Sequence, residues 1–160
     1  MTVPHSSVSR DADREIVLTR ILQAPRELVW KVWTDPQHIA QWWGPNGFTN
    51  TIHAMDVRPG GVWRFIMHGP DGVDYPNKIV FTEVVKPERL VYFHGDDNAT
   101  ADPDFHVTVT FAEHDGQTKL TMQSLFATAE QREMVVREYG AIEGGQQTIN
   151  RLEEYLSKMS

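Results

Sequence analysis

Tyr92 and His94 are the residues near the middle of the chain whose side chains could move a proton. One residue separates them in the apolar segment 90–94, and alternate residues of a strand point to the same face. If that face borders an apolar cavity, the pair could orient the polar end of a ligand or exchange a proton with it. The alternative for His94 is a structural histidine whose hydrogen bonds are satisfied within the protein.

Two acids, Glu83 and Asp56, lie within or at the end of segments that read as strands. An acid that faces a cavity loses its water, which raises the pKa of its carboxyl and makes it an acid–base candidate. An acid that faces solvent is chemically inert. Both orientations stay open, because a single β-bulge reverses the face to which a strand residue points.

Other catalytic chemistries lack the residues that they need. The chain has no cysteine, which excludes disulfides, thiolate zinc sites and a cysteine nucleophile. Its seven histidines show no His-x-x-x-His or similar local pair, so we predict no metal site. No phosphate-binding glycine loop, Gly-x-Ser-x-Gly turn or dinucleotide motif is present, so we expect no nucleotide cofactor and no serine hydrolase mechanism.

Composition limits the class of protein further. The chain has 160 residues, the size of one domain, and a formal net charge of −7. Its Lys and Arg residues are scattered, which argues against nucleic acid and anionic membranes as partners. No apolar segment approaches the ~18 residues of a membrane-spanning helix. We predict a cytoplasmic protein with a flexible tail over 1–13 and a single domain over 14–160.

The elements that would position these residues begin with a strand and two helices. Glu15–Leu22 is rich in β-branched and apolar residues, which is typical of a strand. Pro25 suits the first position of a helix, and Arg26–Thr34 carries an apolar face at helical spacing. Asp35 can cap a second, short helix that extends through Trp42.

The middle of the chain has the period-two pattern of strands separated by short turns. The predicted strands are Thr49–Val57, Val62–His68, Lys78–Val85, Arg89–His94, Phe105–Phe111 and Lys119–Phe126. Connections this short join neighbouring antiparallel strands, because parallel pairing needs long crossovers. The pattern therefore predicts an antiparallel meander.

The last third of the chain returns to helical spacing. Thr128 can cap a helix together with Gln131, three residues later. A long apolar stripe follows at steps of three and four: Val135, Tyr139, Ile142, Gly145, Ile149, Leu152 and Leu156. The order β-α-α-β6-α predicts an α+β fold in which a long C-terminal helix covers a curved antiparallel sheet. A straight helix cannot fill a curved surface evenly, so we expect a cavity between them.

Gly144 and Gly145 are the most informative residues of that helix. Each glycine inside a helix costs roughly 0.8–1 kcal/mol relative to alanine, and Gly145 lies on the apolar stripe. The missing side chain would enlarge the cavity. The alternative is a kink or break that divides the helix near Gly140 to Gly145. The two interpretations are compatible.

The wall of the expected cavity is drawn from bulky residues of the inward strand faces and from the helix stripe. Met67 and Met122 suit an adaptable wall, because methionine repacks easily. Trp42 and Trp43 could serve packing, ligand contact, or one role each. The predicted ligand-binding residues are Trp43, Trp63, Phe65, Met67, Tyr92, His94, Phe105, Val107, Met122, Tyr139, Gly145 and Ile149.

Several motifs along the chain carry a family resemblance. They are Trp33-Thr34-Asp35-Pro36 with Gln41-Trp42-Trp43-Gly44-Pro45, Asp56-Val57-Arg58-Pro59-Gly60-Gly61-Val62-Trp63-Arg64-Phe65, Gly69-Pro70-Asp71-Gly72, Pro87-Glu88-Arg89-Leu90-Val91-Tyr92 and Gln147-Thr148-Ile149-Asn150-Arg151-Leu152. Together they resemble homologues of the heat-shock-protein-90 ATPase activator, within the START-like, birch-pollen-allergen-like (SRPBCC) superfamily, over about residues 14–157. The resemblance implies the helix-grip fold with a cavity, a link to the stress response and a possible chaperone partner.

Three hypotheses of function follow. The first is non-enzymatic binding of a small apolar or aromatic ligand by a monomer or homodimer. The second is an enzyme of the cyclase or hydrolase sort that uses His94, Tyr92, Glu83 or Asp56 as acid–base groups. The third is a protein-interaction module, which predicts an exposed apolar patch or an open strand edge.

Overall fold

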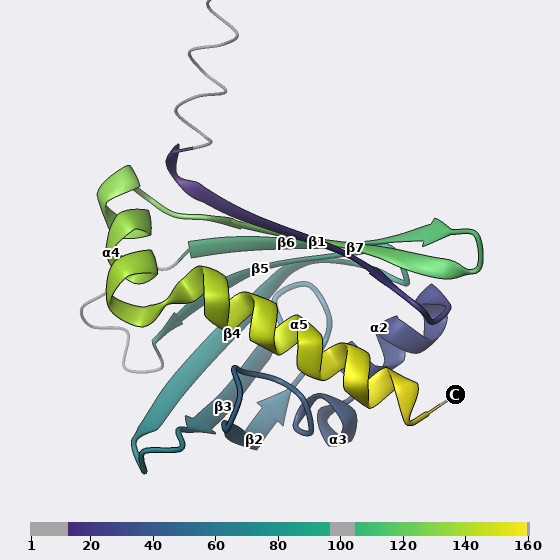
Figure 1. The fold of residues 1–160 in the computed structure, drawn as a ribbon, viewed down its shortest axis with the longest axis horizontal. Coiled ribbons are helices and arrows are strands. Elements are labelled where there is room, and N and C mark those ends of the chain that lie inside the picture. Colours follow the sequence, from purple (N-terminus) through teal and green to yellow (C-terminus); the bar gives the residue numbers. More distant parts are fainter. Residues whose placement is uncertain (1–12, 97–104, 160) are drawn as a thin grey trace, which may run out of the picture.

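A curved antiparallel sheet of seven strands forms the body of the protein (Figure 1). The structure, a computed structural model, describes residues 13–96 and 105–159. Its strands are β1 (Glu15–Leu22), β2 (Thr49–Met55), β3 (Val62–His68), β4 (Asp74–Val85), β5 (Arg89–Asp96), β6 (Phe105–His114) and β7 (Gln117–Leu125). Its helices are α2 (Arg26–Thr34), α3 (Pro36–Ile39), α4 (Ala129–Tyr139) and α5 (Ala141–Ser157).

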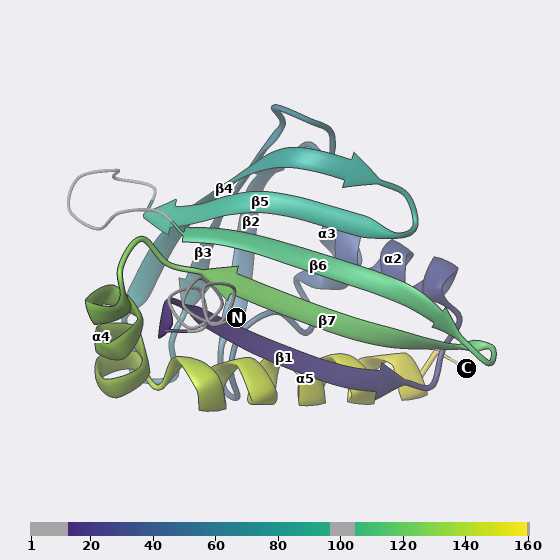
Figure 2. The ribbon, with the colours of Figure 1, turned by 90° about the horizontal axis from the view of Figure 1, so that it is seen from above.

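The strand order explains how the chain closes the sheet. From β2 to β7 each strand pairs antiparallel with the next, and β1 joins beside β7, which gives the order β1-β7-β6-β5-β4-β3-β2. The segment with α2 and α3 carries the chain from one edge strand to the other (Figure 2). Register shifts in β2 and in β4 mark irregularities of the β-bulge kind, which increase the local twist. The α+β sheet with its C-terminal helix is confirmed.

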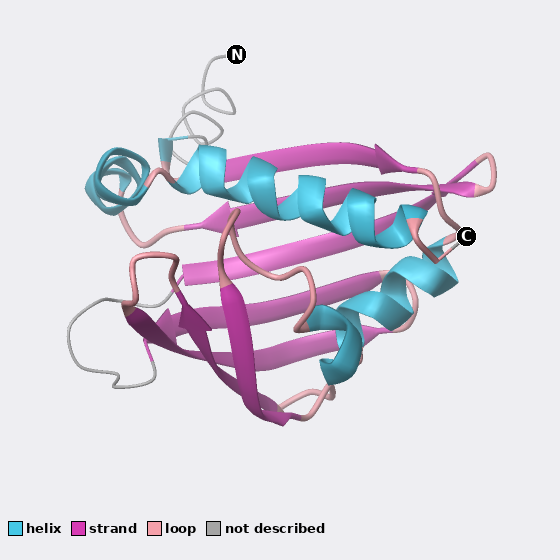
Figure 3. Ribbon diagram, turned by 60° about the horizontal axis from the view of Figure 1, so that its bottom comes forward, coloured by secondary structure: helices cyan, strands magenta, loops and turns pink. Residues whose placement is uncertain are grey.

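α5 lies across the inner face of the sheet with α2 and α3 beside its C-terminal part, and α4 lies at one end of the sheet (Figure 3). α2 presents Val29, Trp30, Val32 and Trp33 to the core, at the spacing of a helix face. The Asp35 side chain accepts a hydrogen bond of 2.9 Å from the Gln37 amide and caps α3. α5 crosses the sheet with Ile149, Leu152 and Leu156 buried beneath it.

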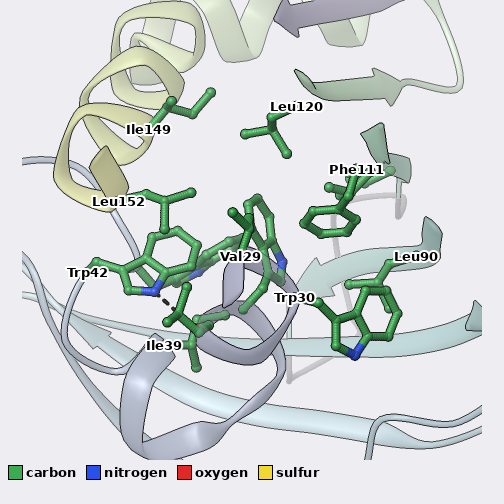
Figure 4. Close-up of a cluster of buried hydrophobic side chains, with 14 of the residues drawn as sticks. Val29, Trp30, Ile39, Trp42, Leu90, Phe111, Leu120, Ile149 and Leu152 are labelled. Carbon is green, nitrogen blue, oxygen red and sulfur yellow. Dashed lines mark hydrogen bonds between the residues drawn. The ribbon is translucent and has the colours of Figure 1, made fainter. Parts of the chain in front are cut away.

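A densely packed aromatic and aliphatic core fills the space beneath the C-terminal part of α5 (Figure 4). Trp33 makes edge-on contacts with Trp42 and with Phe111, at centroid distances of 5.0 and 5.4 Å. Trp42 is 1% exposed, and its indole Nε1 donates a hydrogen bond of 3.1 Å to the Val32 carbonyl. Trp42 could have served packing or ligand contact, and its buried position is that of a packing residue.

The C-terminal helix is the main departure from the predicted elements. It is divided into α4 and α5 at Gly140, which has φ 61° and ψ 44°, a left-handed conformation that favours glycine. Within α5 the stripe residues Ile149, Leu152 and Leu156 are buried, whereas Ile142, in the first turn after the break, is 37% exposed. A long C-terminal helix, α5, is present, and of the interpretations left open for Gly140 to Gly145 the structure contains the break, at Gly140.

Smaller differences concern element ends. β4 begins at Asp74 rather than at Lys78, and α3 ends at Ile39 rather than at Trp42. The predicted tail lies almost wholly outside the described residues, so the division at residue 13 stays a prediction. No helix in the described ranges is long and apolar enough to cross a membrane.

Candidate functional site: a pocket beneath the first turns of the last helix

A pocket with a volume of about 350 Å³ lies between the inner face of the sheet and the N-terminal turns of α5. Strands β1, β3, β5, β6 and β7 contribute to its wall, as do the loop after α3 and the junction of α4 with α5. Its lining is predominantly apolar and aromatic. The described wall residues are Ile16, Trp43, Gly44, Pro45, Met67, Tyr92, His94, Phe105, Val107, Met122, Ser124, Phe126, Gly140, Ala141, Gly144, Gly145 and Thr148.

The first turns of α5 leave this space open because the residues with which they line it, Ala141, Gly144 and Gly145, have little or no side-chain volume. A Cβ atom added at Gly144 would lie 3.4 Å from Cγ of Pro45, an ordinary contact across the pocket mouth. A Cβ atom added at Gly145 would lie 2.5 Å from Cδ1 of Leu18 on β1. Gly144 therefore borders open space, whereas Gly145 also allows α5 to approach β1 closely.

The wall formed by Trp43, Gly44 and Pro45 is fastened to α5 by one side chain. Nη1 of Arg151 donates hydrogen bonds to the carbonyls of these three residues, at 3.2, 2.9 and 2.9 Å. Burial lowers the pKa of the Arg151 guanidinium. Asn50 of β2 adds a bond of 2.9 Å from Nδ2 to the Trp43 carbonyl. The loop is thus held at a fixed distance from the helix.

His94 has its ring orientation set by a chain of hydrogen bonds. Its Nε2 lies 2.9 Å from Oδ1 of Asn77 on the neighbouring strand, and Nδ2 of Asn77 donates to the Tyr75 carbonyl at 2.8 Å. The ring lies against Phe105, with centroids 5.1 Å apart. Loss of water lowers the pKa of His94 to about 4, so the imidazole is neutral near pH 7.

Tyr92 and Ser124 supply the other side-chain polar groups of the wall, with Thr148. Burial raises the pKa of Tyr92, which is 1% exposed, so its phenol stays neutral. Among the described residues, nothing forms a hydrogen bond with the Tyr92 hydroxyl. The Thr148 hydroxyl donates to the Gly144 carbonyl at 2.9 Å. None of the described wall residues is Lys, Arg, Asp or Glu.

Most of the predicted ligand-binding residues meet in this pocket. Trp43, Met67, Tyr92, His94, Phe105, Val107, Met122 and Gly145 line it. Trp63, Phe65 and Ile149 lie in the adjoining core instead; the rings of Trp63 and Phe65 stack with centroids 4.3 Å apart. The side chain of Tyr139 lies outside the described part of the structure. Trp43, unlike Trp42, borders the pocket.

The two acids lie outside the pocket wall. Glu83 pairs with Arg89 at 2.6 Å and Asp56 pairs with Arg58 at 2.7 Å, and both carboxylates are more than 40% exposed. The register shift between Phe81 and Glu83 is the irregularity that removes Glu83 from the inward face of β4. Both acids are solvated. Among the described residues, no group of three or more His, Asp or Glu side chains could hold a metal ion.

Local patterns do not identify every residue of the wall. Gly44 and Pro45 enter only through a motif, as does Arg151, which binds the wall but does not line the pocket. Ser124 follows Met122 by two residues on β7, so the same alternation could have found it. Gly144 was noted for its helix cost but not placed in the wall.

Comparisons with known proteins agree with the fold. A family model described as Activator of Hsp90 ATPase homolog 1-like protein matches residues 23–157. Protein Ms6760 from Mycobacterium smegmatis is 31% identical, with a TM-score of 0.82 and coverage of 91% of this chain and 92% of that one. Protein NE0264 from Nitrosomonas europaea is 29% identical, with a TM-score of 0.81 and coverage of 93% and 97%. A protein from Arthrobacter aurescens is 26% identical, with a TM-score of 0.84 and coverage of 92% and 88%. No curated protein matches the chain.

Proposed function

Because this chain belongs to the family of Activator of Hsp90 ATPase homolog 1-like proteins, we propose that it binds a small, largely apolar ligand in the pocket beneath α5, without chemical turnover. The observation that carries the proposal is a pocket of about 350 Å³, whose described wall is aromatic and aliphatic with few polar groups. Concave sites of this size and lining are typical of small-molecule binding. A cytoplasmic location stays part of the proposal.

The helix stability that is lost by keeping the pocket open favours a role in ligand binding over a role in packing alone. Two adjacent helical glycines together cost roughly 1.6–2 kcal/mol relative to alanine. Arg151 holds the loop at 43–45 in place where that loop forms part of the pocket wall. A wall fixed before the ligand arrives reduces the ordering cost of binding.

Titration with N-phenyl-1-naphthylamine, an uncharged fluorescent probe, tests the proposal. Gly144→Leu places a bulky side chain at the pocket mouth, and we expect it to weaken probe binding by roughly tenfold or more. Glu143→Leu adds the same side chain one residue earlier, at an exposed position, and serves as the matched control. A folded Gly144→Leu variant that binds the probe as tightly as the unmodified protein would refute the proposal.

Gly144 is a better position for this test than Gly145. A side chain at Gly145 first meets Leu18 of β1, so its effect on binding would be mixed with a displaced helix. Gly144 has ordinary contact distance to Pro45 and no closer neighbour, so a substitution there acts mainly on the open volume.

A protein-interaction role is the second candidate, favoured by the family description and by the sheet edge. β1 is an edge strand, and its outward residues Val17 and Ile21 are 48% and 38% exposed. Edge strands with exposed apolar residues are surfaces to which other chains can add. Binding of an Hsp90 chaperone by the unmodified protein and not by Val17→Lys would support this candidate. Equal binding by both, or none by either, would exclude β1 as the docking surface.

An enzymatic role would rest on His94 and Tyr92, the titratable residues of the described wall. Both are neutral near pH 7, which suits hydrogen bonding to a ligand. Recovery of a bound ligand in altered form, lost on substitution of His94, would replace the binding proposal by a catalytic one.

A further inference from the structure

The hydrogen-bond chain behind His94 determines which of its ring nitrogens carries the proton. Nδ2 of Asn77 donates to the Tyr75 carbonyl, so the Asn77 amide oxygen must face His94. An amide oxygen only accepts hydrogen bonds, so Nε2 of His94 is the nitrogen that bears the hydrogen. In a neutral imidazole the other nitrogen, Nδ1, is then a pure acceptor.

We infer that the ligand of this pocket is an uncharged molecule that presents a hydroxyl group to Nδ1 of His94. The inference rests on the proposed function and names the chemical class that the same site would select. Nδ1 has no hydrogen-bond partner among the described residues, although His94 lines the pocket. A ligand hydroxyl satisfies this acceptor, whereas a ligand carbonyl or ether would place a second lone pair against it.

The neighbouring polar groups do not impose the same choice. The hydroxyls of Tyr92 and Ser124 can each donate or accept by rotation, so they tolerate either kind of ligand atom. His94 cannot adjust in this way, because its Nε2 is engaged by Asn77 and its ring lies 5.1 Å from that of Phe105. His94 is therefore the specificity-determining residue.

The described wall offers a ligand carboxylate little to offset its loss of water. A buried carboxylate needs a cation or several donors to offset its loss of water. None of the described wall residues is Lys or Arg, and neutral His94 offers the incoming group a lone pair rather than a proton. The site thus favours an alcohol or a phenol over a fatty or aromatic acid.

Three probes of matched shape test the inference by isothermal titration calorimetry at pH 7. They are 2-naphthol, which donates a hydrogen bond; 2-methoxynaphthalene, which only accepts; and 2-naphthoate, which is anionic. We expect the unmodified protein to prefer 2-naphthol over 2-methoxynaphthalene by roughly fivefold, the effect of one neutral hydrogen bond. Binding of 2-naphthoate should be weaker than that of either neutral probe.

Two variants separate the hydrogen bond from the shape of the wall. His94→Phe keeps a ring at this position, and we expect both neutral probes to bind with the same affinity. Asn77→Leu frees His94 to carry its proton on Nδ1, so the ratio of the affinities for the two neutral probes should shift in favour of 2-methoxynaphthalene. His68→Phe replaces a histidine of β3 that bonds to Thr51 and Asp74 and does not line the pocket, and it should leave the ratio unchanged.

The possible outcomes distinguish this inference from the binding proposal. Equal binding of the two neutral probes by the unmodified protein, or tighter binding of 2-naphthoate, overturns the inference and leaves the pocket as a binding site. A preference for 2-naphthol that persists in His94→Phe also overturns it. Failure of all three probes to bind argues against both.

Discussion

The same sheet and the same helix enclose two regions of opposite character. Beneath the C-terminal half of α5, Leu152 and Leu156 belong to a buried cluster that includes Trp33, Trp42 and Phe111, and side chains fill the space. Beneath the N-terminal half, Gly144 and Gly145 face a pocket of about 350 Å³. The sheet side is rich in aromatic residues in both regions.

The difference between these regions therefore lies mainly in the residues of the helix and of the loop before β2, and not in the curvature of the sheet. Where α5 carries leucines and the α2–α3 segment supplies tryptophans, the gap is closed. Where α5 carries glycines, the sheet residues Tyr92, His94 and Met122 are left lining open space. Stability and binding are thus assigned to different turns of one helix.

Substitution of Trp33 is expected to have the largest effect on this contrast. Trp33 is 2% exposed and contacts three other aromatic rings, Trp42, Trp43 and Phe111. Trp33→Ala should lower the free energy of unfolding by about 3–5 kcal/mol, the usual cost of a large core cavity. Met122→Ala, in the pocket wall, should cost less than about 2 kcal/mol, because it widens an existing space. Urea unfolding measures both, and equal losses would contradict the contrast.

Lowering the pH should destabilise the pocket region through His94. Its pKa is about 4 in the folded protein against 6.5 for a free histidine, so between these values the unfolded chain binds a proton that the folded protein does not. Stability should fall by at most about 3 kcal/mol from pH 7 to pH 4 on this account, with no contribution above pH 7. Urea unfolding of His94→Phe should show a shallower decline over this range. A decline in His94→Phe identical to that of the unmodified protein, from pH 7 to pH 4, would mean that His94 is not held neutral by its surroundings.

Removal of the hydrogen bonds from Arg151 to the loop at 43–45 should affect both stability and ligand binding. Arg151→Met retains the aliphatic length but loses the bonds to the carbonyls at 43–45. We expect a loss of about 2 kcal/mol in urea unfolding, in the range for hydrogen bonds from a charged group, together with weaker probe binding. Arg58→Met removes an exposed pair with Asp56 and should change stability by less than about 0.5 kcal/mol. Similar values for the two variants would show that the loop does not depend on Arg151.

The strands and their inward faces were predictable because alternate residues of a strand face the core and the solvent, and their apolar and polar types alternate accordingly. Period-two spacing put Tyr92 with His94, and Phe105 with Val107, on shared strand faces, and all four residues line the pocket. The start of β4 was missed because Pro76 argues against a strand interior. In the described structure Pro76 pairs only with β3, since the pairing with β5 begins at Asn77, so a missing amide hydrogen is tolerated there.

Features that depend on the approach of distant segments were beyond the reach of local patterns. The bonds from Arg151 to the loop at 43–45 span more than 100 residues of sequence. From the sequence, the glycines from Gly140 to Gly145 indicate either a break in the helix or an enlarged cavity. The local pattern does not show which glycine has which role. The structure contains the break at Gly140 and open space at Gly144, so neighbouring glycines serve different purposes.

A matched pair of alanine substitutions tests this division of roles with the smallest expected effect. Gly144→Ala and Gly145→Ala bring the same gain in helix propensity, about 0.8–1 kcal/mol. At Gly144 the new methyl group meets Pro45 at ordinary contact distance, so the gain should appear in full in urea unfolding. At Gly145 the methyl group meets Leu18 at 2.5 Å, so the gain should be reduced or reversed.

Leu18→Ala should then lower stability less in the Gly145→Ala background than in the unmodified protein, because it removes the collision. Equal stabilisation by both glycine substitutions would mean that α5 does not need Gly145 to approach β1, and the contrast between the two glycines would be lost.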